Sequence, residues 1–359
     1  MTEPSRTALM GSLAPHLGLS KSRLETLAVF LIALVHGRTV NLSHAASQFP
    51  GAALWTSNYR RLQRFFQHVR LDQAVIARLV VAMLDLSRPK CLALDRTNWK
   101  IGRKDINILV LAIVTRRFRV PLLWSVFDHQ GSSSCADRIT LMRRYLALFE
   151  PSSIELLLAD REFTGAEWLK FLIENDISFA IRARQDLHFA RADGKLWSLS
   201  TLLRNKRAGR AVHTCDVFLP ETDLILHVAA KRIKNGEWLI VLTNNADAKH
   251  ALRTYRRRWA VECLFADAKT RGFNLEDTHL TSLAKIETLL ALVALAMTWT
   301  YRSATQIMGM KAIPRKTHGR RQKSWFRIGL DALRHAIFQR PDWAANAWTS
   351  NCPRRQLKP

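Results

Sequence analysis

The spacing of hydrophobic and polar positions divides the chain into a helical start, a strand-rich middle and a helical end. In residues 22–37, SRLETLAVFLIALVHG, apolar side chains recur at helical spacing up to Gly37, which predicts a helix that ends there. Residues 71–86, LDQAVIARLVVAMLDL, show the same spacing shortly before Pro89. The pattern therefore predicts a helical region over residues 1–88.

Two shorter amphipathic segments lie between these helices, on either side of a Pro50-Gly51 turn. They are NLSHAASQF and TSNYRRLQRFFQHV, and a pair of short helices with a tight connection is typical of a helix-turn-helix. The second segment carries cations that suit DNA phosphates, while its aromatic residues would pack inward. The predicted DNA-contacting residues here are Arg60, Arg61 and Arg64. An ordinary amphipathic helix with a solvated basic face would show the same pattern.

From Lys90 onward the apolar positions gather in short runs. The runs are CLALD (91–95), INILVLAIV (106–114), VPLLWSVF (120–127) and SIELLLAD (153–160). They are short, β-branched or leucine-rich and separated by charged turns, so they predict strands. A helix predicted over 137–149 precedes the fourth run. Three strands, a helix and another strand indicate an α/β layer.

Residues 184–245 predict a mostly β module. Asp193-Gly194 and Asn235-Gly236 each separate two apolar runs, and both dipeptides favour hairpin turns. Helices are predicted to return after residue 245. The longest apolar stretch, TLLALVALAMTWTY (288–301), is shorter than the roughly 18 residues that a membrane span needs, so it predicts a buried helix over 283–301. The basic segment 309–327 is expected to be a flexible or DNA-contacting linker.

Composition and charge narrow the class of protein. With 359 residues, 48% of them hydrophobic, the chain can fold into two or three domains. Its 55 Lys and Arg against 29 Asp and Glu leave a net charge of +26, which predicts a nucleic-acid partner rather than a membrane. Five scattered cysteines without C-x-x-C indicate neither a disulfide framework nor a zinc site. The N-terminus lacks the pattern of a signal peptide, so we expect a cytoplasmic protein.

Three carboxylates are the candidate chemical groups. Asp95 and Asp160 each end a strand-like run, and Glu262 lies within the basic segment YRRRWAVECLFADAK (255–269). An Asp after a strand is also a common turn residue or helix N-cap. Carboxylates among cations suit phosphodiester chemistry, in which two Mg²⁺ ions about 4 Å apart assist an in-line displacement. Mn²⁺ is the ion that we expect to substitute for Mg²⁺.

The basic segment also has a helical stripe. On an ideal helix Tyr255, Arg258, Glu262 and Lys269 fall within an arc of roughly 60°. A plain surface ion pair between Arg258 and Glu262, four residues apart, would produce part of this pattern.

These motifs together resemble a known family. The spacing Tyr255-x2-Arg258-x3-Glu262-x6-Lys269 resembles the Y-R-E-K signature of bacterial insertion-sequence transposases of the DDE class, in the insertion-sequence-four group. LDRTNW around Asp95 and ADREF around Asp160 are similar to that family's motifs around its two catalytic aspartates. The resemblance covers roughly residues 55–305.

The resemblance implies an α/β fold with an RNase H-like catalytic core, interrupted by a mostly β insertion and flanked by helical N- and C-terminal regions. It implies that Asp95, Asp160 and Glu262 are the catalytic residues and metal ligands. The expected regions are a helical DNA-binding region at 1–88, the two parts of the core at 89–183 and 246–306, the insertion at 184–245, and a basic helical region at 307–359.

The resemblance also implies a cut-and-paste reaction through a DNA hairpin. The expected DNA is double-stranded, with terminal inverted repeats and a target site, and the expected assembly is a homodimer on DNA. Tyr255, Arg258 and Lys269 would handle phosphates. Trp238 resembles the tryptophan that fills the space left by a flipped base, and Trp259 resembles the aromatic residue beside that base, although core packing would also explain them.

The sequence leaves several alternative interpretations open. Asp128 and Glu162 are alternative metal ligands, although turn or salt-bridge roles suit them better, and Arg161 contacts DNA or merely flanks the site. A DNA-binding protein that has lost catalysis and a metal-dependent nuclease are the two competing functions.

Overall fold

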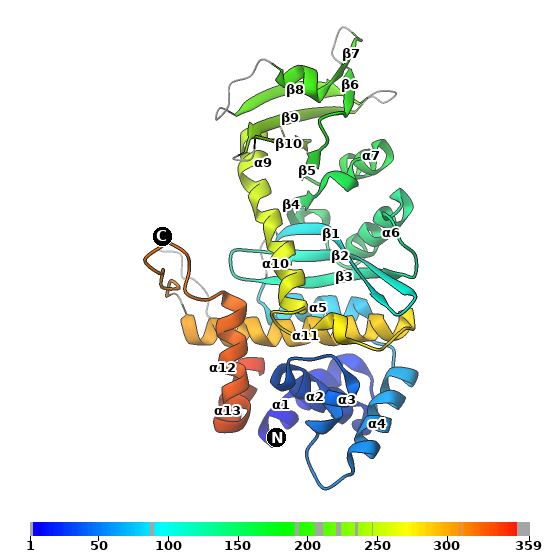
Figure 1. Ribbon diagram of the computed structural model, residues 1–359, viewed down its shortest axis with the longest axis vertical. Coiled ribbons are helices and arrows are strands. Elements are labelled where there is room, and N and C mark those ends of the chain that lie inside the picture. The colour runs from blue at the N-terminus through cyan, green and yellow to red at the C-terminus, as the bar shows by residue number, and fades with distance from the viewer. Residues whose placement is uncertain are drawn as a thin grey trace.

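The protein is a mixed α/β molecule built on one large sheet, seen here in a computed structural model (Figure 1). The structure describes residues 3–86, 90–190, 194–204, 211–219, 224–233, 236–245, 247–309 and 311–349. The predicted turn residues Asp193 and Asn235 lie outside these ranges. Gly194 and Gly236, which follow them, have φ angles of 74° and 86°, in the left-handed region that glycine adopts readily.

Ten strands form the sheet in the described part of the chain, in the order β3-β2-β1-β4-β5-β10-β9-β8-β6-β7. The three hairpin-connected strands β1, β2 and β3 pair antiparallel, and β1, β4 and β5 pair parallel. Their bounds are β1 Lys90–Ile101, β2 Lys104–Val114, β3 Arg119–Phe127, β4 Ile154–Ala159, β5 Phe179–Ala183, β6 His188–Ala190, β7 Leu196–Ser198, β8 Val212–Phe218, β9 Ile225–Arg232 and β10 Trp238–Thr243.

The four strands predicted from apolar runs are confirmed, with one correction. The run 91–95 belongs to a strand that continues to Ile101, so Asp95 lies in the middle of β1 and not at its end. The extension exists because Gly102, at φ 59°, turns the chain back into β2, and residues 96–101 pair with 104–109. The predicted helix after β3 is α6 (Cys135–Leu146), which starts at a capping box of Ser134 and Asp137.

The strands of segment 184–245 continue the same sheet. β10 pairs antiparallel with β5 through four residue pairs, from Ile240↔Ala183 to Thr243↔Ala180. The predicted β module includes the apolar run after Asp193-Gly194, LWSLSTLL (196–203), and the second half of this run is not a strand. After β7 the chain forms a short helix, α8 (Leu199–Leu203), because the Ser198 side chain caps it by accepting a hydrogen bond from the Thr201 N–H.

The N-terminal region is helical, as predicted, and contains one helix, α1, that was not individually predicted; these helices pack beneath the sheet around α11 (Figure 1). They are α1 Glu3–Leu17, α2 Lys21–Gly37, α3 Leu42–Ser47, α4 Trp55–His68 and α5 Gln73–Met83. Helix α11 (Leu283–Met308) extends seven residues beyond the predicted end. By length and composition it is apolar enough to cross a membrane, but 78% of its most apolar window is buried inside the protein. It is a buried helix, as predicted.

The C-terminal region is more ordered than the predicted linker. Residues 311–324 include a turn closed by the Arg315↔Arg321 bridge, and helix α12 (Trp325–Gln339) begins within the segment that was expected to be linker. Helix α13 (Pro341–Thr349) follows. Apolar packing of Trp325 and Phe326, both nearly buried, fixes the start of α12 against the core.

Candidate active site

Strand pairing places the two predicted aspartates side by side. β1 and β4 run parallel, and Leu94 pairs with Ala159, so Asp95 and Asp160 are the next residues in register on adjacent strands. Asp160 follows the end of β4 and caps a short 3-10 turn, with its Oδ1 accepting the Arg161 N–H at 2.8 Å. Asp95 Oδ1 accepts the Arg96 N–H in the same way, at 2.8 Å.

Glu262 reaches this pair from a different element. The predicted continuous helical stripe is corrected: α9 (Ala248–Tyr255) passes into a 3-10 turn at Arg256–Arg258, and α10 (Trp259–Ala268) follows. Glu262 lies in the first turn of α10. Lys269 lies just past its end, so it is not part of the same helical face.

Arg258 connects the three carboxylates. Its Nη1 is 3.0 Å from Asp95 Oδ2, and its Nη2 is 2.8 Å from Glu262 Oε1 and 3.9 Å from Asp160 Oδ2. The guanidinium side chain is only 11% exposed. The pair Arg258–Glu262 is therefore not a plain surface ion pair, because its cation is buried among two further acidic groups.

Burial and charge shift the ionisation of this cluster. Burial raises the pKa of Asp95 to about 6, against the lowering effects of the Arg96 N–H and Arg258. Glu262 and Asp160 raise the pKa of Asp95 further, because like charges disfavour its ionised form. For Arg258, burial lowers the pKa, but the surrounding acidic groups outweigh it and the net pKa is raised. The cluster therefore favours a bound positive charge.

Tyr255 lies beside the cluster as a buried phenol. Its pKa is raised above the ordinary value, chiefly by burial. Its hydroxyl is buried without a hydrogen-bond partner in the described part of the chain. A phenol that is hard to ionise is a poor nucleophile.

Other predicted residues lie apart from the carboxylates. Lys269 Nζ is 2.6 Å from Glu276 Oε1 and 5.7 Å from the centre of the Trp99 ring. Trp259, at the start of α10, is 66% exposed, so core packing does not explain it. Trp238 is partly buried and lines a cavity of about 300 Å³ together with Arg161 and Arg182.

Glu162 forms a bidentate ion pair next to the aspartates, which is one of the two roles that the sequence favoured, but its partner Arg96 was not predicted. Arg96 Nε and Nη2 lie 3.3 and 3.0 Å from the two oxygens of Glu162. Arg96 Nη1 also donates to Asn107 Oδ1 at 3.2 Å and to the Gly131 carbonyl. The contact favours the salt-bridge role of Glu162 over metal binding. The Arg96–Glu162 pair could have been predicted if the two aspartate motifs had been placed on adjacent strands, because Arg96 follows Asp95 and Glu162 lies two residues after Asp160.

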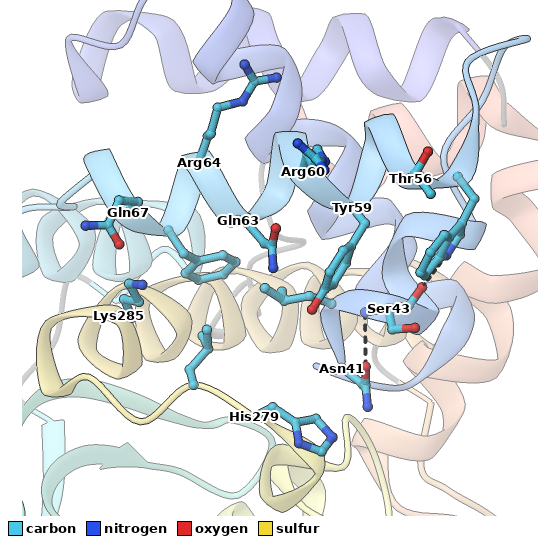
Figure 2. A pocket seen from close by; sticks show the side chains of 14 residues that line it. Asn41, Ser43, Thr56, Tyr59, Arg60, Gln63, Arg64, Gln67, His279 and Lys285 are labelled. Carbon is cyan, nitrogen blue, oxygen red and sulfur yellow. Dashed lines mark hydrogen bonds between the residues drawn. The ribbon is translucent and has the colours of Figure 1, made fainter.

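The N-terminal region carries a separate groove of about 1190 Å³ beside α4 (Figure 2). Tyr59 points into it from α4, and Trp55 stacks on Tyr59 with the ring planes at 3°. Arg60 and Arg64 border the groove, although Arg64 points away from its floor. Arg61 does not line it, because its guanidinium pairs with Glu25 at 2.9 Å. The predicted DNA contact of Arg61 thus competes with an internal ion pair.

The described residues contain no group of three or more His, Cys, Asp or Glu side chains arranged to hold a metal ion. In this structure the Arg258 guanidinium takes the place between the predicted ligands. The donor set still suits a hard cation, because it consists of carboxylate oxygens that already share one positive charge.

Comparison with known proteins identifies the family. The sequence profile described as "Transposase DDE domain" matches residues 86–299, which is more than half of the chain and spans all three carboxylates. A search of curated proteins gave no match. The match agrees with the resemblance seen in the motifs around Asp95, Asp160 and Glu262, and the chain belongs to the family of DDE-domain transposases.

Proposed function

We propose that this protein is a cut-and-paste DNA transposase of the insertion-sequence-four group, acting on the inverted repeats of its own element. The observation that carries the proposal is the convergence of Asp95, Asp160 and Glu262 on one guanidinium. The order β3-β2-β1-β4-β5, antiparallel then parallel, supports an RNase H-like core in the half of the sheet that ends at the edge strand β3.

Asp95, Asp160 and Glu262 would hold two Mg²⁺ ions, or Mn²⁺ in their place. When bound, the ions would supply activation of the attacking oxygen and stabilisation of the leaving oxygen. Arg258 would withdraw from the carboxylates and turn toward a DNA phosphate. The unpartnered hydroxyl of Tyr255 supports this proposal, because it would donate to a phosphate oxygen beside the cluster.

The proposed reaction has four in-line attacks on phosphorus: nicking at the element end, attack by the freed 3′-hydroxyl to form a hairpin, reopening by water, and joining to target DNA. A hairpin requires sharp distortion of the duplex, and an aromatic side chain would stabilise a base flipped from the stack. Trp238, in a cavity lined by Arg161 and Arg182, supports this step because it offers a stacking surface next to cations. The exposed indole of Trp259 would contact the same distorted DNA.

Partners and location follow from the same proposal. The protein would act as a homodimer on DNA, in the cytoplasm at the nucleoid. Arg60 and Arg64 beside the α4 groove would contact the element end, and Lys269 would exchange Glu276 for a phosphate.

The test is cleavage of DNA that carries the gene's own flanking ends, with and without Mg²⁺. Glu262→Gln removes a negative charge from the cluster without changing its shape, so we expect end binding to persist and cleavage to fall by about 10³-fold or more. Glu174→Gln is the matched control, because Glu174 is exposed on α7 (Ala166–Glu174). Cleavage by Glu262→Gln at the wild-type rate would refute the assignment. Binding without cleavage by any variant, wild type included, would favour a non-catalytic descendant, and cleavage without joining would favour a nuclease.

The hairpin step has its own test. Trp238→Ala should still nick the element end but form less hairpin, because the flipped base loses its stacking partner. The measurement is product analysis on denaturing gels, with Trp343→Ala on α13 as the control. Equal hairpin yields in both variants would exclude this role for Trp238.

A further inference from the structure

A second cationic site lies at the C-terminal region, away from the carboxylates. The turn at residues 115–118 and the segment 311–325 enclose a cleft of about 290 Å³. Its polar lining consists of cations, with the indole of Trp325 as one wall. We call it the C-terminal cleft, and its characteristic residues are Arg116, Arg117, Lys311, Arg315, Arg321 and Trp325.

The cleft is unbalanced in charge. No carboxylate lines it among the described residues, and Arg116, Lys311, Arg315 and Arg321 form no ion pair within that part of the chain. The acidic residue of α12, Asp331, already pairs with Lys323 and Arg327 at 2.9 and 2.8 Å. Like charges held together repel one another, so an anion in the cleft would be stabilised.

The walls of the cleft are held in place. The Thr115 and Phe118 backbones bond across the turn at 2.7 Å, and the Lys316 N–H donates to the Arg320 carbonyl at 2.8 Å. The Gln322 N–H donates to the Pro314 carbonyl at 2.9 Å, and the Arg117 guanidinium lies 4.9 Å from the Trp325 ring centre. The cations are therefore presented by defined turns.

The cleft is also tied to the catalytic helix. Arg119, just after the turn, pairs with the buried Asp267 of α10 at 2.9 Å, and Tyr301 donates to the same carboxylate at 3.3 Å. A side chain at Gly272 would collide with Phe326, the neighbour of Trp325, so α12 packs directly on the turn after α10. A partner bound in the cleft would have a set position relative to Glu262.

We propose that the C-terminal cleft binds the phosphate backbone of a DNA duplex, independently of base sequence. The same turn carries two further exposed cations, Lys316 and Arg320, and so many cations suit a polyanion better than a single small ion. In Figure 1 the segment between α11 and α12 projects to the side of the sheet, where a long partner has access. The choice of DNA rests on the proposed function.

The test is the salt dependence of binding to a random-sequence duplex. A triple variant, Lys311→Gln, Arg315→Gln and Arg321→Gln, should lower the slope of log K against log salt by about 2–3, since each phosphate contact contributes roughly 0.9. The matched control replaces Lys21, Arg78 and Lys170, exposed residues on three separate helices, by Gln. Equal slopes for the triple variant and the control would overturn the proposal.

A second measurement needs no variant. In the wild type, acetylation of Lys311 should slow by about 5-fold or more when the duplex is added, and equal rates would contradict the cleft. The wild type could bind inorganic phosphate and the triple variant fail to do so, while both proteins show the same salt slope for DNA. That result would assign the cleft to a small anion and overturn the proposal. Wild-type cleavage of element ends is scored separately: its absence refutes the proposed transposase, whereas an unchanged slope refutes only the cleft.

Discussion

Asp95 combines burial with a charge that changes near neutral pH. Its pKa is raised to about 6, chiefly by burial, from an ordinary value of 3.8. Between these values the native protein binds more protons at Asp95 than the unfolded chain does. The stabilisation that Asp95 contributes through its raised pKa is therefore present at about pH 4 and falls as the pH rises through about 6. Above that pH it no longer changes.

Asp95→Asn should remove this pH dependence. The unfolding free energy of Asp95→Asn minus that of wild type should increase by about 2–3 kcal/mol between pH 4 and pH 6.5, because wild type loses stability over this range and the variant does not. The size follows because one pKa unit corresponds to about 1.4 kcal/mol. The measurement is urea unfolding in the presence of a chelator. Asp186→Asn, at an exposed site, serves as control. A constant difference between wild type and Asp95→Asn across this range would show that the carboxyl titrates normally.

The Arg96–Glu162 ion pair joins the segments that follow the two aspartates. Both side chains are about a quarter exposed and the contact is bidentate, so it should outweigh an ordinary surface pair. We expect Arg96→Gln and Glu162→Gln to be non-additive, with a coupling energy of about 1–2 kcal/mol in unfolding. The double variant should cleave DNA no more slowly than the worse single variant. Additive losses in a double-mutant cycle would mean that Glu162 acts separately, for example as a metal ligand.

At the scale of elements, the contact between α11 and α12 depends on a glycine. A Cβ at Gly329 would lie 1.9 Å from the Thr300 carbonyl oxygen, so the two helices can approach this closely only without a side chain there. Gly329→Ala should lower the unfolding free energy by about 1–3 kcal/mol through overpacking.

Gly11 offers the matched control for this substitution. It lies inside α1, and a Cβ there would meet nothing within 4 Å. Gly11→Ala should stabilise by about 0.5–1 kcal/mol, because glycine is less favourable than alanine inside a helix. Urea unfolding of both variants is the measurement. A Gly329→Ala protein as stable as wild type would show that α12 can shift away from α11.

At the scale of the whole molecule, the sheet is continuous from β3 to β7. Because β10 pairs with β5 in the middle of it, β5 and β10 should open together. Hydrogen-exchange mass spectrometry should therefore give similar protection for residues 179–183 and 238–243. If residues 238–243 exchange about 100 times faster than residues 179–183, the strands of 184–245 unfold as a separate unit.

Local patterns were sufficient to predict most elements and to single out three carboxylates that lie around Arg258 in the structure. Periodicity and length of apolar segments depend only on residues close together in the sequence. They were enough to predict the strands of the four apolar runs after Lys90, the helix at 22–37 and the buried helix at 283–301. The motifs around Asp95, Asp160 and Glu262 led to the transposase family, and the family match confirms that conclusion. The errors at Asp95 and in LWSLSTLL concern where an element ends, since turns and caps compete closely there with continued pairing.

Contacts between distant segments were not predictable in this way. Asp95 meets Asp160 because of the parallel register of β1 and β4, which apolar periodicity does not specify. Arg258 turns toward carboxylates and Arg61 toward Glu25, although both were expected on DNA, because a cation in the folded chain pairs with whichever acidic group the packing brings near. The C-terminal cleft likewise joins residues some 200 positions apart. The local sequence therefore determined the family and the secondary-structure elements. Strand order, register and helix packing determined which acidic group each cation pairs with.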